Sequence, residues 1–307
     1  MSLDFPPARF AVCLLVFLCV PACSPESSSE TPCRTDDDCA SLAPKHACRH
    51  FVCQEPVCPA GSVYVGSGPF ERGCNADETD CDKNAQPRHT VVIDHGFCAS
   101  VTELQVGQYR QCIAQGGCPA SHDLRCSADL ATWTDVPAAQ ETMPMTCLLW
   151  SEALAACRFL GGRLPTEAEW EKLARGRDAR LYPWGNVQPL GCGTALNYDG
   201  GGNCPDRPWP ATPENRKGAQ LSSPFSAVDL AGNVWEWVTD NYSETAYQDC
   251  ASGCVDPIGP ITGFLRSRRG GSYKSSRFQE LTTFFRDFHT PEVARSDNQG
   301  ARCIFPQ

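Results

Sequence analysis

The sequence predicts an α+β domain that is rich in disulfides and poor in regular secondary structure. Helical periodicity is confined to three short stretches, all in the first half of the expected main domain. Strand-like stretches are few and short, and the 25 glycines and 25 prolines indicate that loops make up most of the connections. The 21 cysteines can supply the cross-links that such a loop-rich domain needs.

The first 22 residues resemble a secretory signal peptide. Arg9 supplies a basic start, residues 10–20 form an apolar run, and small residues precede Cys23. Because a membrane-spanning helix needs roughly 20 apolar residues, the shorter run here predicts cleavage. The sequence resembles a bacterial lipoprotein cleavage box, in which Pro21 is uncommon. It predicts lipid attachment at Cys23, a linker over 23–32, and a place in the cell envelope at the outer membrane, with a soluble secreted protein as the alternative.

The cysteine count predicts a disulfide framework. Once Cys13 and Cys19 leave with the signal and Cys23 is acylated, an even number of 18 remains. In an oxidising compartment such cysteines are mostly structural, and a local disulfide is expected between Cys250 and Cys254. The net charge of −10 offers no clustered basic face, which excludes nucleic acid as an expected partner.

Residues 33–57 predict a small cysteine-rich module, because the stretch is too short and polar to bury a core and needs two disulfides to hold it. His46 and His50 have the spacing of metal ligands on a helix. Cys48 lies between them and no carboxylate follows, so we do not expect a metal there. The module is interpreted as a spacer or a recognition module for an unknown partner.

The main domain is expected over residues 58–307 and begins with a helical stretch. Thr102 and Gln105 form a capping-box pattern, and apolar residues follow on one helical face. Gly116 and Gly117 are expected to end this helix.

Two more helices are predicted in close succession. The first begins at Ser151 and ends at a glycine pair. The residues on its apolar face are Leu154, Cys157 and Leu160. Thr166 with Glu169 forms a capping box for the next helix, which ends before Gly176.

Residues 89–93 and 234–238 are predicted as isolated strands, because each is a short β-branched or aromatic run between loop residues. The sequence has no phosphate-binding Walker loop, no dinucleotide fingerprint and no HExxH string, so those enzyme classes are not indicated.

Five strings occur in one order along the main domain. They are GGRLPTEAEWEKLARG (161–176), YPWGN (182–186), VDLAGNVWEWVTD (228–240), RGGSY (269–273) and GARC (300–303). Together they resemble the formylglycine-generating, sulfatase-modifying factor family over residues 58–303. The resemblance is specific because all the strings occur in one order, whereas any one of them alone would be weak evidence. The resemblance implies a compact, C-type-lectin-like domain with little regular secondary structure.

The VDLAGNVWEW segment predicts a calcium site. Asp229, Asn233 and Glu236 bring three oxygen-bearing side chains together around Gly232, and calcium prefers oxygen ligands on such a turn. The resemblance implies that Asp229 and Glu236 bind a structural calcium ion through their side chains, and Gly232 and Val234 through their carbonyl groups.

A second calcium site is implied less completely. Asn197 resembles one of its ligands, but CPDRPWP at 204–210 replaces the spacing of the family, so the other ligands do not align. At the first site the family often has asparagine where this chain has Asp229, and a carboxylate adds charge there. The alternative interpretation is that no calcium binds here and that Asp229 and Glu236 only cap turns.

The copper site of the family is not expected in this chain. The oxygen-using members oxidise a substrate cysteine to formylglycine with O₂ and a copper ion held by two thiolates. Their two cysteines sit two and seven residues after the tyrosine that matches Tyr273, where this chain has Ser275 and Glu280. Soft Cu(I) needs sulfur ligands, and no cysteine lies between Cys254 and Cys303 to replace them.

Other catalytic sets have little support in the sequence. Trp235 matches an aromatic of the family's active cleft and Ser272 a hydroxyl near its oxygen-binding position, although without the resemblance they would be core and turn residues. A branch that uses non-haem iron needs several histidines, and only His289 lies near these segments. Ser272 or Ser275 with His289 and Asp287 would make a hydrolase, but no nucleophile-elbow motif is present.

Two functional classes therefore remain, and whether the chain is an enzyme stays open. The favoured one is an exported lipoprotein and pseudoenzyme, which keeps a calcium-stabilised scaffold and binds a peptide, glycan or protein. The alternative is an oxygen-dependent oxidoreductase of the same superfamily with altered metal ligands. Fold alone does not decide between them, so the missing thiols carry more weight than the shared scaffold.

Overall fold

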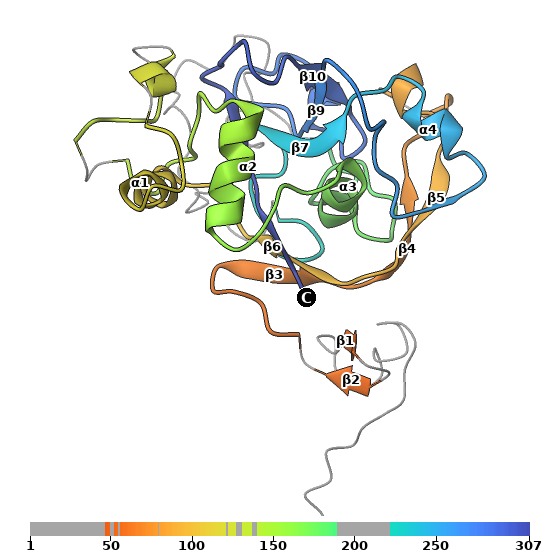
Figure 1. Cartoon of the computed structure of the whole chain (residues 1–307). Helices are drawn as coiled ribbons and strands as arrows, with labels where there is room; N and C mark the ends of the chain where they lie inside the picture. The colour runs from red at the N-terminus through yellow and green to blue at the C-terminus, as the bar shows by residue number, and fades with distance from the viewer. Residues whose placement is uncertain are drawn as a thin grey trace, which may run out of the picture.

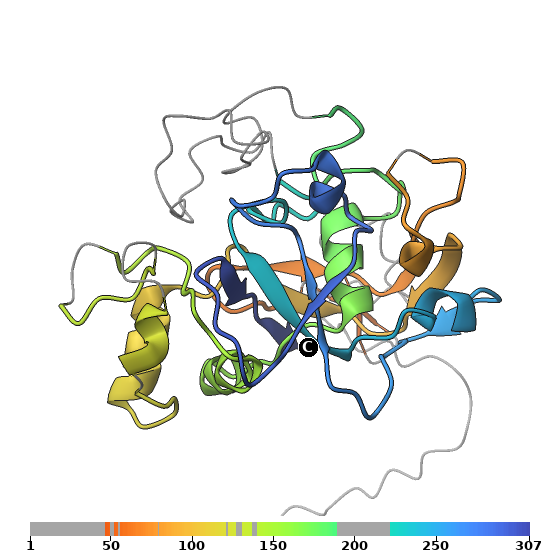
Figure 2. The same ribbon diagram turned by 90° about the horizontal axis from the view of Figure 1, so that it is seen from above.

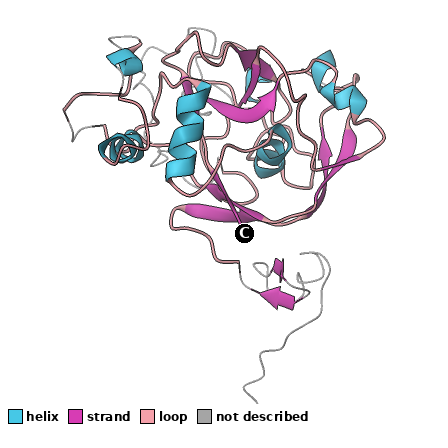
Figure 3. Cartoon of the chain, viewed as in Figure 1, coloured by secondary structure: helices cyan, strands magenta, loops and turns pink. Residues whose placement is uncertain are grey.

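The computed structural model describes residues 47–49, 52–54, 56–78, 80–120, 122–126, 131–136, 140–188 and 222–307. Loops make up most of the fold, as predicted, and short helices and small sheets are both present (Figure 3). The hairpin of β1 and β2 is drawn apart from the main body (Figure 1). In the ranges given above, no helix has the length and apolar character needed to cross a bilayer. The predicted signal, the predicted lipid attachment at Cys23 and the predicted linker lie outside the described residues.

The described strands form four small sheets. The first pairs β1 (Ala47–Arg49) with β2 (Val52–Gln54). The second has the order β10 (Asp287–His289), β9 (Arg266–Arg269), β7 (Trp235–Asn241), β11 (Gln299–Ala301). The third has the order β12 (Ile304–Pro306), β6 (Phe97–Ser100), β3 (Ser62–Val65). The fourth has the order β4 (Gly68–Arg72), β5 (His89–Ile93), β8 (Cys254–Val255).

Both predicted strands exist, but the prediction that they are isolated was wrong. Residues 89–93 form β5, which lies between β4 and β8, and β7 begins one residue after the predicted start and lies between β9 and β11. The partners come from distant parts of the chain, so their pairing satisfies buried backbone groups that no local sequence pattern indicates.

The four described α-helices are short. They are α1 (Val106–Ala114), α2 (Trp150–Phe159), α3 (Glu167–Arg175) and α4 (Ala246–Asp249). Single 3₁₀ turns lie at η2 (Lys83–Ala85), η3 (His122–Arg125) and η5 (Phe278–Leu281). Figure 2 shows α3 near the middle of the main body, with α1 and α2 side by side.

The predicted cap is confirmed at α3 and differs at α1, and the buried face of α2 differs in part from the prediction. Thr166 caps α3 by accepting a hydrogen bond from the backbone of Glu169, as predicted. The first helix begins later than predicted, because Gln105 rather than Thr102 is the capping residue, and the Gln108 side chain accepts from its backbone N–H. In α2 the fully buried face consists mainly of Ala153, Ala156 and Cys157, whereas Leu154 and Leu160 are only partly buried.

Six disulfides fasten the described loops to one another, including the predicted local one. They are Cys58–Cys98, Cys74–Cys81, Cys112–Cys118, Cys126–Cys147, Cys157–Cys303 and Cys250–Cys254. The bond from Cys157 joins α2 to the C-terminal strands across 146 residues of sequence. Cross-links of this kind limit the unfolded chain and stabilise a domain that has small sheets.

A buried ionic network joins two of the five strings that the main domain contains. The guanidinium of Arg269 lies 3.0 Å from a carboxylate oxygen of Glu167 and 3.0 Å from one of Glu171, both in α3. Arg286 Nε donates to Glu167 at 2.7 Å. Burial opposes ionisation of Glu167, but the guanidinium groups of Arg286 and Arg269 hold its pKa well below the usual range. Removing one member of such a buried pair costs about 3–5 kcal/mol. The TEAEWE and RGGSY strings therefore meet for a structural reason.

Candidate functional site

A turn before β7 gathers the predicted calcium ligands. Asp229, Gly232 and Asn233 all have left-handed backbone conformations, with φ of 62°, 89° and 58°. Asp and Asn tolerate this region better than other residues with a Cβ, and glycine adopts it freely. The sharp turn places Asp229 and Glu236 in the buried interior, where each is exposed by 1% or less.

Glu236 is held by two donors from other elements. Arg302, fully buried, donates to it through Nη2 at 2.9 Å and through Nε at 3.1 and 3.2 Å. The indole Nε1 of Trp170 donates to the same carboxylate at 2.7 Å. Arg302 also donates to the carbonyl of Val228, so the guanidinium ties the turn to the GARC string. Glu236 is thus a structural anchor as well as a candidate ligand.

Among the predicted calcium ligands, Asp229 has the surroundings that most favour a bound cation. Neither of its carboxylate oxygens receives a hydrogen bond from the described part of the chain. Burial and the nearby Glu236 raise the pKa of Asp229 to about 7, although Arg302 opposes the shift. An unpaired buried carboxylate is unfavourable unless it takes up a proton or binds a cation.

Glu103 completes a group of oxygen atoms that the sequence did not indicate. It accepts a hydrogen bond from Asn233 Nδ2 at 2.8 Å, while its other oxygen and Asn233 Oδ1 have no partner among the described residues. Burial, followed by the charge of Asp229, raises its pKa well above the usual range. Unsatisfied oxygens on three buried side chains are the kind of ligand atom that calcium, a hard cation, prefers.

The donor set therefore fits calcium, with Asp229 supplying free oxygens and the carbonyl groups of Gly232 and Val234 lying in the same turn. Each carboxylate oxygen of Glu236 already accepts two hydrogen bonds from Arg302 and Trp170, so Glu236 would bind a cation only by giving up part of these contacts. Its contacts with Arg302 mean that it would be shared between the cation and the guanidinium. Asn197, the predicted ligand of a second site, lies outside the described residues.

The segment after Arg269 forms a turn closed by serine hydroxyls. Ser275 Oγ accepts from the backbone N–H of Ser272 at 2.9 Å, and Ser272 Oγ accepts from Asn298 Nδ2 at 2.9 Å. Gly271 approaches so closely that a Cβ there would lie 2.7 Å from the carbonyl of Glu280. Both serines are buried, and their hydroxyls hold this turn together.

The remaining cleft candidates lie in contact with charged side chains. Glu280 accepts from Arg277 Nε at 3.1 Å. Trp235 is 5% exposed, with the guanidinium of Arg268 at 4.7 Å from its ring centre and Phe285 at 6.1 Å. From Cys58 onward, the cysteines in the described ranges are all disulfide-bonded and leave no thiol beside these residues.

The structure does not assemble the hydrolase set. Asp287 binds Arg268 at 2.7 Å, and His289 Nδ1 lies 3.1 Å from the carbonyl oxygen of Thr290. Ser272 accepts a hydrogen bond from Asn298. These contacts therefore do not link a serine to His289 as base and His289 to Asp287, as a catalytic triad requires.

The fold and these contacts define a disulfide-stapled, C-type-lectin-like domain with a buried carboxylate turn. A family model described as "Sulfatase-modifying factor enzyme 1-like domain" matches residues 50–306, and the chain belongs to this family. The formylglycine-generating enzyme of Streptomyces coelicolor is 37% identical over 171 residues, 52% of each chain. That of Bos taurus is 34% identical over 172 residues, 52% of this chain and 43% of the relative. The chain thus spans about half the length of these two relatives.

Solved structures show the same fold at low identity. The structure of PvdO from Pseudomonas aeruginosa has a TM-score of 0.62 at 19% identity and covers 80% of this chain and 94% of its own. Treponema denticola variable protein 1 has a TM-score of 0.57 at 20% identity, covering 80% and 95%. At these identities the likeness concerns the fold alone.

Three residues of the site escaped prediction. Glu103 precedes α1 and gives no local signal, because its partner Asn233 lies 130 residues away. Arg302 lies within the GARC string, and Asn298 lies two residues before it. The presence of that string was the sequence signal that could have pointed to both residues.

Proposed function

We propose that this protein is an exported, lipid-anchored binding or scaffold module of the sulfatase-modifying factor family that does not generate formylglycine. The observation that carries the proposal is the turn after Arg269. The positions two and seven residues beyond Tyr273 hold Ser275 and Glu280, one in a structural hydrogen bond and one paired with Arg277. Neither side chain offers sulfur, which linear Cu(I) coordination requires.

Calcium is part of this proposal. The unpartnered oxygens of Asp229 support a bound cation at the turn before β7, and Arg302 and Trp170 hold Glu236 beside it. Such an ion would stabilise a loop-rich domain by binding the folded state alone.

The surface supports a protein or peptide as ligand. Four of the nine large apolar side chains exposed in the described ranges lie in one ten-residue segment, and Ile261 and Phe264 there are 94% and 95% exposed. The four are Val255, Ile258, Ile261 and Phe264. Apolar groups gathered on a surface commonly mark an interaction site, since their burial by a partner is favourable.

Export and lipidation rest on residues 1–23, whose apolar run and Cys23 support attachment to the cell envelope. Mass spectrometry of the N-terminal peptide from membranes tests this part. An acylated Cys23 is expected, and a free N-terminus after residue 22 in the soluble fraction would contradict it.

The catalytic part is tested with a cysteine-containing sulfatase peptide. The purified, oxidised protein is loaded with copper, desalted and assayed for O₂ uptake and for conversion of the peptide. Retained calcium without copper, O₂ uptake or aldehyde supports the proposal. Peptide-dependent O₂ uptake with copper or iron would instead support the oxidoreductase with altered metal ligands.

A further inference from the structure

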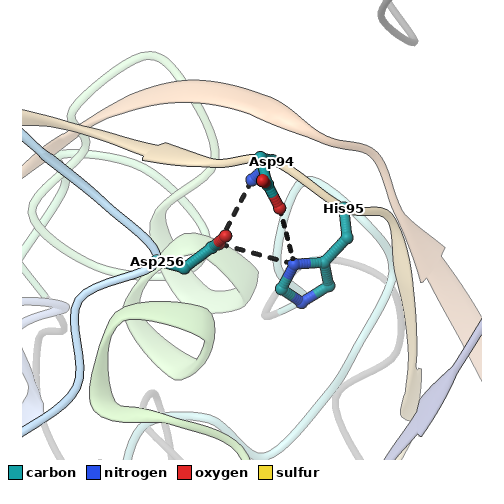
Figure 4. Close-up of side chains that lie close together, drawn as sticks. All are labelled: Asp94, His95 and Asp256. Atoms are coloured by element: carbon teal, nitrogen blue, oxygen red, sulfur yellow. Dashed lines mark hydrogen bonds and ion pairs between the residues drawn. The ribbon is translucent and has the colours of Figure 1, made fainter.

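Three side chains that are common metal ligands meet where two parallel strands end. The register of β5 and β8 aligns Val92 with Val255, so Asp94 and Asp256 follow the strands at the same edge. Asp256 donates its backbone N–H to the carbonyl of Val92 at 2.8 Å, and its carboxylate accepts from the backbone of Asp94 at 3.1 Å. His95 comes next in the chain and turns its ring toward both carboxylates (Figure 4).

The distances in this cluster match the edges of a metal coordination polyhedron. His95 Nδ1 lies 3.2 Å from Asp94 Oδ1 and 3.4 Å from Asp256 Oδ1, and all three atoms lie within 4.8 Å of one another. Ion-paired N–H···O contacts are usually about 2.7–2.9 Å long. In a tetrahedral zinc site with bonds of about 2.0 Å, neighbouring ligand atoms are about 3.3 Å apart. The two separations from Nδ1 fit this second geometry, and the shorter one is also within hydrogen-bonding distance.

A buried carboxylate fixes the histidine ring. His95 Nε2 lies 3.0 Å from Glu169 Oε1, and Glu169 is held by Arg163 at 2.7 and 2.8 Å and by the backbone of Thr166 at 2.7 Å. This contact directs Nδ1 at Asp94 and Asp256. A carboxylate on the second ring nitrogen is the usual support of a metal-binding histidine, where it sets the tautomer and the ring orientation.

The charge balance and the surroundings leave room for a divalent ion. The contacts of the ring with Glu169 and Asp94 raise the pKa of His95 to about 9, so a bound ion would replace the proton on Nδ1. The carboxylates of Asp94, Asp256 and Glu169 then exceed the single charge of Arg163 by two, which one divalent cation would neutralise. His95 and Asp256 also line a cavity of about 290 Å³, whose walls include Ile93, Thr239 and Ile258. A metal at the cluster would therefore have a free coordination position facing a partly apolar cavity.

We propose that Asp94, His95 and Asp256 bind one divalent transition-metal ion of the zinc type through one nitrogen and two oxygens. The fourth position takes water or a ligand from the cavity. Calcium and magnesium are disfavoured because they prefer oxygen ligands alone, whereas imidazole suits zinc and its neighbours. This site is separate from the proposed calcium turn and does not depend on the proposed function.

The test uses the full mature chain without an affinity tag, oxidised, stripped of metals and held in excess calcium at pH 7.5. Zinc is titrated in competition with a chromophoric chelator, and cobalt is added separately to record its visible absorption. Wild type is expected to bind one zinc that His95→Gln and Asp256→Asn each weaken at least about tenfold. Asp178→Asn is the matched control, because Asp178 is exposed and its ion pair among the described residues is with Arg180.

Two results would overturn the proposal. One is zinc binding of equal strength in wild type and in the two variants, which would place the ion elsewhere, for example at His46 and His50. The other is absence of any zinc binding tighter than the weakest that the chelator reports. Circular dichroism checks the fold of each variant, and Asp94→Asn, at the most exposed of the three side chains, provides a further variant if one of them fails to fold.

Discussion

Replacement of Asp229 by asparagine is expected to stabilise the calcium-free protein. The wild-type carboxylate is buried without a hydrogen-bond donor among the described residues, and its pKa is raised from 3.8 to about 7, mainly by burial. This increase in pKa means that ionisation of Asp229 destabilises the folded state by about 4 kcal/mol. Asparagine has nearly the same shape and no charge. In chelator at pH 8 the variant should be more stable than wild type by up to about 4 kcal/mol.

The pH dependence of this difference has a definite sign. Because the pKa of Asp229 is raised in the folded state, its favourable contribution is fully present below the unfolded value of 3.8 and is lost as the pH rises through about 7. In chelator, the variant and wild type should therefore be nearly equal in stability at pH 4 and differ most above pH 7.

Calcium should reduce the advantage of the variant. At 100 times its dissociation constant, calcium adds about 2.7 kcal/mol to the stability of the protein that binds it. Wild type gains this amount, and Asp229→Asn gains less because its ligand has lost a charge. Denaturant unfolding of both proteins at pH 8, with calcium and with chelator, measures the four values, and Asp178→Asn serves as the exposed control. An identical difference between variant and wild type in calcium and in chelator would refute a calcium ion at Asp229.

Three further predictions concern stability. Glu236→Gln should lower the free energy of unfolding by about 3 kcal/mol or more in chelator, because it leaves the buried Arg302 without its carboxylate, and by more in calcium, for which Glu236 is a candidate ligand; a loss seen only in calcium would show that Glu236 acts solely as a ligand. Thr166→Ala should cost about 1 kcal/mol in thermal or denaturant unfolding through the lost cap of α3, whereas Thr102→Ala should cost almost nothing; equal losses would contradict the assigned caps. Breaking the 157–303 disulfide by serine substitution should cost about 5 kcal/mol, because it closes a loop of 146 residues; a denaturant midpoint close to that of wild type would contradict this.

Local sequence patterns predicted the helices better than the sheets. The Thr166 cap depends on Glu169, three residues further on, and the end of α3 depends on Gly176 itself. Each signal is local, so the sequence contains all of it. The start of α1 was misplaced because two capping patterns, at Thr102 and Gln105, overlap and only the second is used. The neighbours of β5 and β7 could not be predicted, since β8 and β11 pair with them across long stretches of chain.

The candidate site was likewise predictable where its residues are neighbours in sequence. Asp229 and Gly232 lie on the turn and Glu236 in the strand β7 that follows it, and ligand chemistry and resemblance predicted all three as calcium ligands. The contact of Glu236 with Arg302 was not expected, because a pattern of residues shows which side chains can bind a cation but not which guanidinium already lies beside them. The cluster at His95 could not be predicted from the sequence for a similar reason. Asp256 is far from His95 in the chain and lies beside it because β5 pairs with β8.

The central claim, a family scaffold without formylglycine generation, is tested most directly by copper content and O₂ uptake in one sample. The purified, oxidised mature protein is incubated with Cu(I), freed of unbound metal, analysed for copper and calcium, and then given the sulfatase peptide in an oxygen electrode. We expect bound calcium, no retained copper and no peptide-dependent O₂ uptake, because Ser275 and Glu280 supply no thiolate. One equivalent of copper together with O₂ uptake and peptide aldehyde would contradict the account.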